Sequence, residues 1–68
     1  MSDLEFAMLM KKYRAFKNYT LVELSSATNL SLASLVKIEK TGRGYLRSKV
    51  AIAQALGFSE KEINSLLK

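Results

Sequence analysis

The stretch from Tyr19 to Glu39 constrains the fold more than any other part of the chain, because it contains signals for two helix starts and one helix end. Thr20 followed three residues later by Glu23 forms a capping-box pattern, which predicts a helix that begins at the next residue after the threonine. Asn29 tolerates the left-handed backbone conformation of a helix exit. Ser31 is a good N-cap for a second helix. The stretch therefore predicts two helices joined by a four-residue turn.

Apolar spacing indicates which sides of these two helices meet. Leu35 and Ile38 lie three residues apart in the second helix and are expected to pack against Leu24 of the first. Leu30 is expected to fill the turn between the helices. The residues expected to point outward from the second helix are Leu32, Ala33, Ser34 and Lys37. Two locked helices with a free outer side are typical of helix-turn-helix readers of DNA.

The rest of the chain also predicts helices, so its 68 residues are expected to form one all-α domain, residues 1–68, with about five short helices. Ser2 with Glu5, and Ser59 with Glu62, repeat the capping-box pattern and predict two further helix starts. A fourth helix is expected from about Ser48 to Gly57, where glycine suits the exit. No proline interrupts the chain, and no segment alternates strongly enough to predict a strand.

The first helix carries more apolar surface than one small domain can cover. Its core-facing residues are expected to be Phe6, Leu9 or Met10, Tyr13 and Phe16. The run from Phe6 to Met10 is apolar on every side of a helix, and Leu66 and Leu67 add apolar surface near the other end. A domain this small buries only about 60% of the surface that its unfolded chain exposes. We therefore expect a homodimer.

Composition narrows the class of function. Eleven Lys and Arg against six Asp and Glu give a net charge of +5, which is typical of nucleic-acid binding. The chain has no cysteine and no histidine, so a disulfide, a Cys/His zinc site and a histidine acid–base pair are excluded. Helix caps account for most of the carboxylates, so we expect neither an enzyme nor a cofactor. A secretory signal and an apolar run of membrane length are lacking, which favours the cytoplasm.

With these motifs, the chain resembles the Cro and repressor class (XRE-like) of helix-turn-helix regulators found in phages and bacteria. The likeness covers roughly residues 13–63: the helix-turn-helix at about 20–40 and the closing segment TGRGYLRSKVAIAQALGFSEKEI. It implies a lambda-repressor-like fold and a homodimer that regulates transcription by placing the second motif helix in the major groove of a pseudo-palindromic operator. It also implies a partly buried ion pair, because Arg14 and Glu39 stand where the family often has these two residue types.

For double-stranded DNA as the partner, the candidate residues divide into those that read bases and those that position the protein. Candidates for base contacts are Leu32, Ala33, Ser34 and Lys37. Candidates for phosphate or minor-groove contacts are Thr20, Leu21, Lys40, Arg43, Tyr45 and Arg47. The family usually has glutamine at position 21, and its members commonly carry Gln, Arg or Asn at positions 32 and 33. Specificity is therefore expected to rest on thymine methyl contacts and DNA shape.

The apolar residues at positions where the family usually has polar ones leave a second function open. The outer surface of the second motif helix, apolar at Leu32, Ala33 and Leu35, would then face another protein. The chain would act as an antirepressor or modulator that blocks the DNA surface of a phage repressor, or as an antitoxin that docks on its toxin. Leu21 also favours this function, whereas the basic loop from Lys40 to Lys49 favours DNA. The residues expected to form only a solvated face are Lys11, Lys12 and Lys17.

Overall fold

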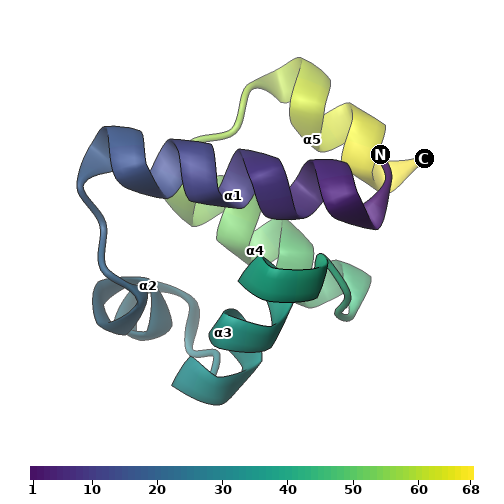
Figure 1. The fold of residues 1–68 in the computed structure, drawn as a ribbon. Helices are drawn as coiled ribbons and strands as arrows, with labels where there is room; N and C mark the ends of the chain where they lie inside the picture. Colours follow the sequence, from purple (N-terminus) through teal and green to yellow (C-terminus); the bar gives the residue numbers. More distant parts are fainter.

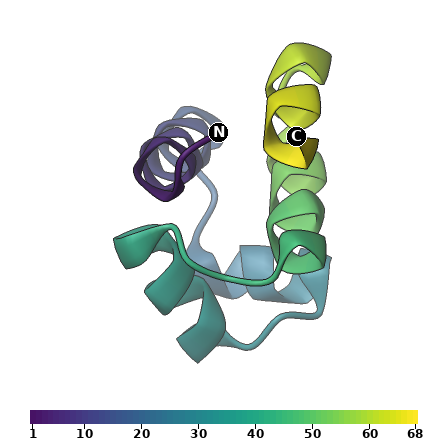
Figure 2. The same cartoon turned by 90° about the vertical axis from the view of Figure 1, so that its right-hand side faces the viewer.

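The computed structural model describes residues 1–68 and contains five α-helices and no strand, which confirms the all-α expectation. The helices are α1 (Asp3–Lys17), α2 (Leu21–Thr28), α3 (Leu32–Thr41), α4 (Leu46–Leu56) and α5 (Glu60–Leu67). Helix α1 lies across the molecule, with α5 on one side of it and α2 and α3 on the other (Figure 1). Viewed along α1, α4 and α5 form one column, and α3 lies beneath α1 (Figure 2). The elements together measure 28 × 21 × 17 Å.

Side-chain caps explain where most helices begin. Capping boxes at Ser2, Thr20 and Ser59 start α1, α2 and α5, as their sequence patterns predict. Ser31 starts α3 by accepting a hydrogen bond from the backbone N–H of Ser34. The residues that end α1 to α4 all have a left-handed backbone conformation, and they are Asn18, Asn29, Gly42 and Gly57.

The turn between α2 and α3 is one residue shorter than expected, because only residues 29–31 separate the two helices. Small polar side chains of α2 hold it in place. The Ser25 hydroxyl donates to the carbonyl of Leu30 at 2.6 Å, and the Thr28 hydroxyl accepts from the Leu30 N–H at 3.3 Å. Leu30 itself, expected to fill the turn, is partly buried and packs against the core. The turn therefore fixes the start of α3 relative to α2.

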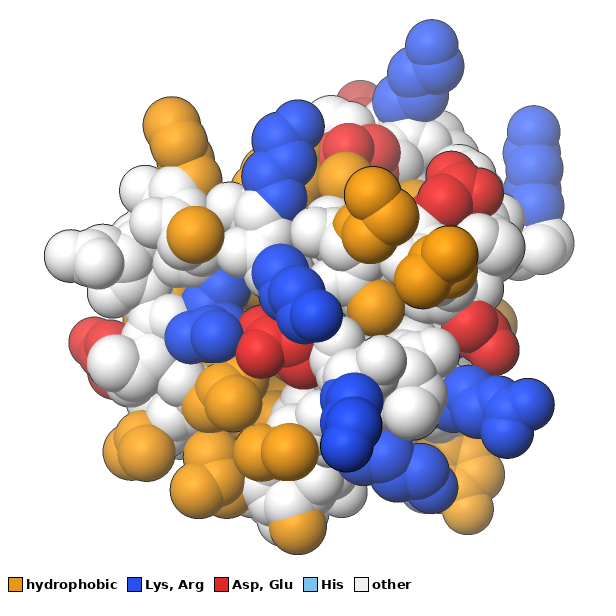
Figure 3. Space-filling view, in the orientation of Figure 1, with side chains coloured by type: hydrophobic (Ala, Val, Ile, Leu, Met, Phe, Trp, Pro, Cys, Tyr) orange, Lys and Arg blue, Asp and Glu red, His pale blue; other side chains and the backbone are white.

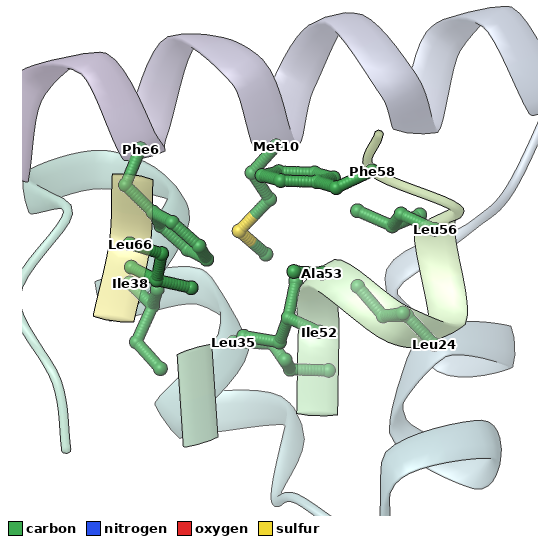
Figure 4. Close-up of a cluster of buried hydrophobic side chains, with 10 residues drawn as sticks. All are labelled: Phe6, Met10, Leu24, Leu35, Ile38, Ile52, Ala53, Leu56, Phe58 and Leu66. Carbon is green, nitrogen blue, oxygen red and sulfur yellow. The ribbon is translucent and has the colours of Figure 1, made fainter. Parts of the chain in front are cut away.

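A single apolar core joins all five helices. Its buried side chains are Phe6, Met10, Leu24, Leu35, Ile38, Ile52, Ala53, Leu56, Phe58 and Leu66 (Figure 4). Phe6 and Met10 point down from α1 onto side chains that rise from α3 and α4. Phe58 stacks on Tyr13, with 4.7 Å between the ring centroids, and also meets Phe6 at 5.7 Å. Burial of this apolar surface is the main favourable contribution to folding.

Three polar or close contacts fasten α1 to later parts of the chain. The ammonium of Lys49 in α4 lies 2.9 Å from Asp3 Oδ1, and the Tyr13 hydroxyl donates to Glu62 in α5 at 2.5 Å. Gly42, at the end of α3, has φ +73° and lies against the first turn of α1. A Cβ atom at this position would sit 1.7 Å from the carbonyl oxygen of Asp3, so only glycine permits this approach.

Two sequence-based predictions about the helices are wrong in detail. Phe16 does not face the core and is 87% exposed. Two three-residue steps from Met10 to Phe16 fall short of two turns of about 3.6 residues, and this shortfall rotates the side chain away from the core. Helix α4 begins at Leu46 and not near Ser48, because Tyr45 acts as the N-cap without a side-chain hydrogen bond.

None of the helices combines the length and apolar character needed to cross a membrane.

Candidate nucleic-acid interface

The outer side of α3 is free, and it changes character along the helix. The four residues expected to point outward, Leu32, Ala33, Ser34 and Lys37, are all exposed. Val36 is also exposed, although sequence reasoning missed it; its position four residues after Leu32 was the available signal. Apolar side chains gather over α2 and the start of α3 at the lower left of Figure 3, and basic side chains gather toward the end of α3 at the lower right.

A partly buried ion pair holds α3 against α1. Arg14 Nε lies 2.7 Å from Glu39 Oε2, and Arg14 Nη2 donates to Glu39 Oε1 at 3.1 Å. Arg14 Nη1 also donates to the carbonyl of Tyr19 at 2.9 Å, in the loop before α2. The expected pair is therefore present, and it links α1, α3 and the entrance to α2. Its two-pronged geometry constrains the orientation of α3 more strongly than a single contact would.

A shallow hollow of about 120 Å³ lies between α3 and the loop that follows it. Its lining residues are Ser34, Lys37, Ile38, Arg43, Gly44, Tyr45 and Ser48. The hollow thus brings together two predicted base-reading residues and two predicted phosphate-contacting residues from different elements. The loop is held by the Thr41 hydroxyl, which accepts from the backbone N–H of Arg43 at 3.1 Å. Two cations beside hydroxyl groups make this hollow suitable for an anion such as a phosphate.

The basic surface continues on both sides of the hollow. Arg47, in the first turn of α4, places its guanidinium carbon 5.3 Å from the centroid of the Tyr45 ring, a cation–π arrangement. This contact limits the freedom of both exposed side chains. Lys40 is exposed in the last turn of α3 and takes part in no ion pair. Its charge remains available to a partner of opposite sign.

Thr20 and Leu21 lie outside the hollow, at the start of α2. The Thr20 hydroxyl accepts from the Glu23 N–H at 3.0 Å, and the Glu23 carboxylate accepts from the Thr20 N–H at 2.9 Å. The backbone hydrogen bond from Thr20 lowers the pKa of Glu23, so this carboxylate stays ionised beside the free amides of the first turn. The Leu21 side chain packs against the core. An anion at this end of α2 would therefore meet one fixed negative charge.

The expectation of a basic loop from Lys40 to Lys49 is wrong at its end, which is helical and contains a buried lysine. The last residues of that segment are helical, and Lys49 is buried. Its ammonium pairs with Asp3 and lies 5.2 Å from the centroid of the Phe6 ring. The hydrogen bond from Lys49 also lowers the pKa of Asp3. Lys49 is thus a structural cation, and the charges of this segment that remain exposed are Lys40, Arg43 and Arg47.

No group of three or more acidic, histidine or cysteine side chains is placed to hold a metal ion. No protein-family model, curated protein or solved structure matches the chain. The residues around α3 are therefore the basis for a functional assignment.

Proposed function

We propose that the chain is a sequence-specific DNA-binding regulator of transcription, similar to the Cro and repressor class. One observation carries this proposal: Lys37 on the outer side of α3 shares a hollow with Arg43 and Tyr45 of the next loop. A helix that exposes its outer side beside a cationic hollow can enter a major groove while the hollow holds a backbone phosphate. The net charge of +5 adds long-range attraction to DNA.

In this proposal, residues 20–40 act as a helix-turn-helix and α3 is the recognition helix. Lys37 donates to a guanine edge, and Ser34 forms a hydrogen bond with a neighbouring base. Leu32 and Ala33 contact thymine methyl groups, and the exposed Val36 extends this apolar strip. Because these side chains offer few hydrogen bonds to bases, DNA shape supplies a larger share of the specificity.

The positioning contacts are proposed for the flanks of α3. Arg43, Tyr45 and Lys40 bind phosphates, and Arg47 is directed to the minor groove. The proposed protein is a cytoplasmic homodimer with a lambda-repressor-like arrangement of helices. Its two α3 helices then meet major-groove faces about 34 Å apart on a pseudo-palindromic operator. The proposed role of Thr20 and Leu21 is limited to donation from the hydroxyl and backbone amides, because Leu21 packs inward.

The test is a mobility-shift assay with the DNA that flanks the chain's own gene, at about 150 mM salt with excess competitor DNA. Moderate salt matters because a chain of this charge binds any duplex when salt is low. The proposal expects a discrete complex that resists competitor and gives a footprint with regularly spaced half-sites. Smeared complexes that competitor removes would count against sequence-specific reading.

A second candidate function follows from the exposed apolar side chains of α2 and of the first half of α3. Val22, Leu32 and Val36 are each 44% or more exposed. Leu32 and Val36 lie on the side of α3 that would have to enter the groove, and Val22 lies on α2. Such exposed apolar side chains suit a protein surface at least as well as a base edge. The chain would then bind a repressor and block its DNA surface, or bind a toxin. This function predicts no competitor-resistant DNA complex.

A further inference from the structure

The outer side of α1 is apolar in its first half, although it faces away from the core. Leu4 is 70% exposed and Met8 is 63% exposed, and both lie on the side of the helix opposite the buried Phe6 and Met10. Ala15 continues the same side toward the end of the helix. We call Leu4, Met8 and Ala15 the outer strip. It is separate from α3 and from the cationic hollow, and none of the contacts described above covers it.

Charges beside the outer strip change sign along the helix. Glu5 stands in the first turn, and Lys12 follows seven residues later, so both lie on the same flank of the strip about two turns apart. Neither residue belongs to an ion pair within the chain. Lys11, also exposed, lies between Met8 and Ala15 on the same side of the helix and adds a further positive charge to the second half. The outer side of α1 is thus apolar at Leu4 and Met8, with an acidic residue beside its first half and basic residues in its second half.

We propose that a second copy of this chain covers the outer strip, with the two α1 helices antiparallel and Met8 next to the two-fold axis. A two-fold axis makes the same patch on both copies meet itself, so the patch must be self-complementary. Antiparallel pairing brings the acidic end of one helix to the basic end of the other. Glu5 of one copy then lies opposite Lys12 of the other, and this pair occurs twice. Parallel pairing would place this flank on opposite sides of the two copies, so the Glu5–Lys12 pairs would not form.

A groove on the same flank supports this pairing. It has a volume of about 370 Å³, lies between α1 and α5, and is lined by Met1, Glu5, Met8, Leu9, Lys61, Glu62 and Ser65. Its lining includes two carboxylates and one ammonium, that of Lys61, so its net charge is negative and it can receive a long cationic side chain from the other copy. Lys12 lies on this flank, because it stands three residues after Leu9 and seven after Glu5, which both line the groove. Its charge also helps to lower the pKa of Glu62, after the hydrogen bonds from Tyr13 and Ser59.

The dimer is expected to be weak. Helix α1 has 15 residues, which corresponds to about 22 Å, so the contact is smaller than the roughly 800 Å² per partner of a standard interface. Binding of two copies to adjacent half-sites would strengthen the dimer by mass action. The inference rests on the homodimer in the proposed function and specifies its contact surface. It does not require DNA to form.

Sedimentation equilibrium of the whole chain without DNA tests the inference, over about 10 µM to 1 mM. A reversible monomer–dimer equilibrium is expected. Met8→Lys should weaken the dimer at least about tenfold, because it puts two charges at the centre of the contact. Leu67→Lys is the matched control, since Leu67 is 54% exposed on α5, and it should leave the dimer unchanged. A monomer throughout this range, or a loss only with Leu67→Lys, would overturn the inference.

Charge reversal tests the antiparallel arrangement. Glu5→Lys and Lys12→Glu should each weaken the dimer about three- to tenfold, and the double variant should recover because both pairs form again with exchanged signs. Glu5→Gln separates charge from capping, since glutamine also accepts in a capping box. A double variant as weak as the singles would refute the antiparallel pairing. Loss of DNA binding with an intact dimer would instead count only against the proposed function.

Discussion

The guanidinium of Arg14 donates two hydrogen bonds to the carboxylate of Glu39, and its remaining nitrogen donates one to the carbonyl of Tyr19. The side chains of the ion pair are 28% and 13% exposed, respectively. One arginine on α1 therefore sets the positions of α3 and of the loop that enters α2. Binding of a partner to α3 therefore depends on this ion pair, even though the partner does not contact it.

Replacement of Glu39 by glutamine should destabilise the fold. The Glu39→Gln variant keeps the shape of the side chain but leaves the guanidinium of Arg14 without its counter-charge in a partly buried place. We expect a loss of about 1–3 kcal/mol in the free energy of unfolding, less than for a fully buried pair because water reaches Arg14. Urea denaturation measures it, with the exposed Glu60→Gln as control. A loss below about 0.5 kcal/mol would mean that the pair is not structural.

Lys37 and Arg43 should behave differently toward DNA. Lys37→Ala should relax the preference at one base pair, at a cost of about 1–3 kcal/mol for the preferred site, because a base contact is lost. Arg43→Ala should weaken binding to all sequences alike and reduce the salt slope by about one, because a phosphate contact is lost. Binding titrations on operator variants at several salt concentrations measure both effects. Equal losses on every sequence for both variants would contradict this division.

Lys49 should contribute nothing to DNA binding despite its charge. Lys49→Met keeps the length of the buried side chain and leaves Asp3, whose side chain is 54% exposed, in contact with water. The free energy of unfolding should change by less than about 1 kcal/mol, and DNA affinity should stay within about twofold of the parent chain. Lys40→Met is the matched control and should reduce the salt slope by about one. An equal effect of both variants on DNA affinity would show that burial does not remove Lys49 from the interface.

The hydrogen bond between Tyr13 and Glu62 should make stability depend on pH in two directions. The bond lowers the pKa of Glu62, so its contribution is lost as pH falls below the usual glutamate value of about 4.3. It raises the pKa of Tyr13, so the contribution is also lost as pH rises above about 10.

Tyr13→Phe removes this bond and keeps the ring that stacks on Phe58. The stability difference between the parent chain and the variant should therefore be largest between about pH 5 and 9 and shrink on either side. Urea denaturation across the pH range measures it. The difference should not come from the carboxylates of Asp3 and Glu23, which titrate in both proteins. A difference that is the same at every pH would refute the coupling.

Leu32→Glu separates the two candidate functions. If α3 reads DNA, a carboxylate at this exposed position comes close to phosphates and should weaken DNA binding at least about tenfold. If the apolar surface binds a protein, binding of a repressor or toxin partner should be lost while residual DNA affinity stays nearly unchanged. Leu67→Glu provides the same change on α5. Titrations with DNA and with the purified partner distinguish the outcomes.

Local chemistry explains why much of the fold could be predicted from the sequence. Capping at Thr20 and Ser59 and the left-handed exit at Asn29 depend only on neighbouring residues, and the structure has all three. The start of α4 was misplaced because Tyr45 offers no side-chain cap that a sequence pattern could reveal. The burial of Lys49 gave no local signal either, since its partner Asp3 lies 46 residues away in the chain.

The candidate site shows the same division between local and distant information. The helical period of α3 predicted that Lys37 points outward, which the structure confirms. The hollow that joins Lys37 to Arg43 and Tyr45 depends on how the loop folds back across α3, and the spacing of residues along one helix does not contain that information. The functions assigned to these residues remain predictions.

The fastening of α1 to α4 and α5 has a consequence for the order of events during synthesis. The ribosome makes α1 before the other four helices, yet the side chains that hold its two ends in place, Lys49 and Glu62, come much later. Until they emerge, α1 can pack against α3, to which the Arg14–Glu39 pair joins it, but the side of α1 that faces α4 and α5 stays uncovered. Contacts between segments this far apart form only after the intervening chain has closed into a loop. Helix α1 is therefore expected to reach its final position only after α4 and α5 have been made, and one of its apolar sides stays exposed for that interval.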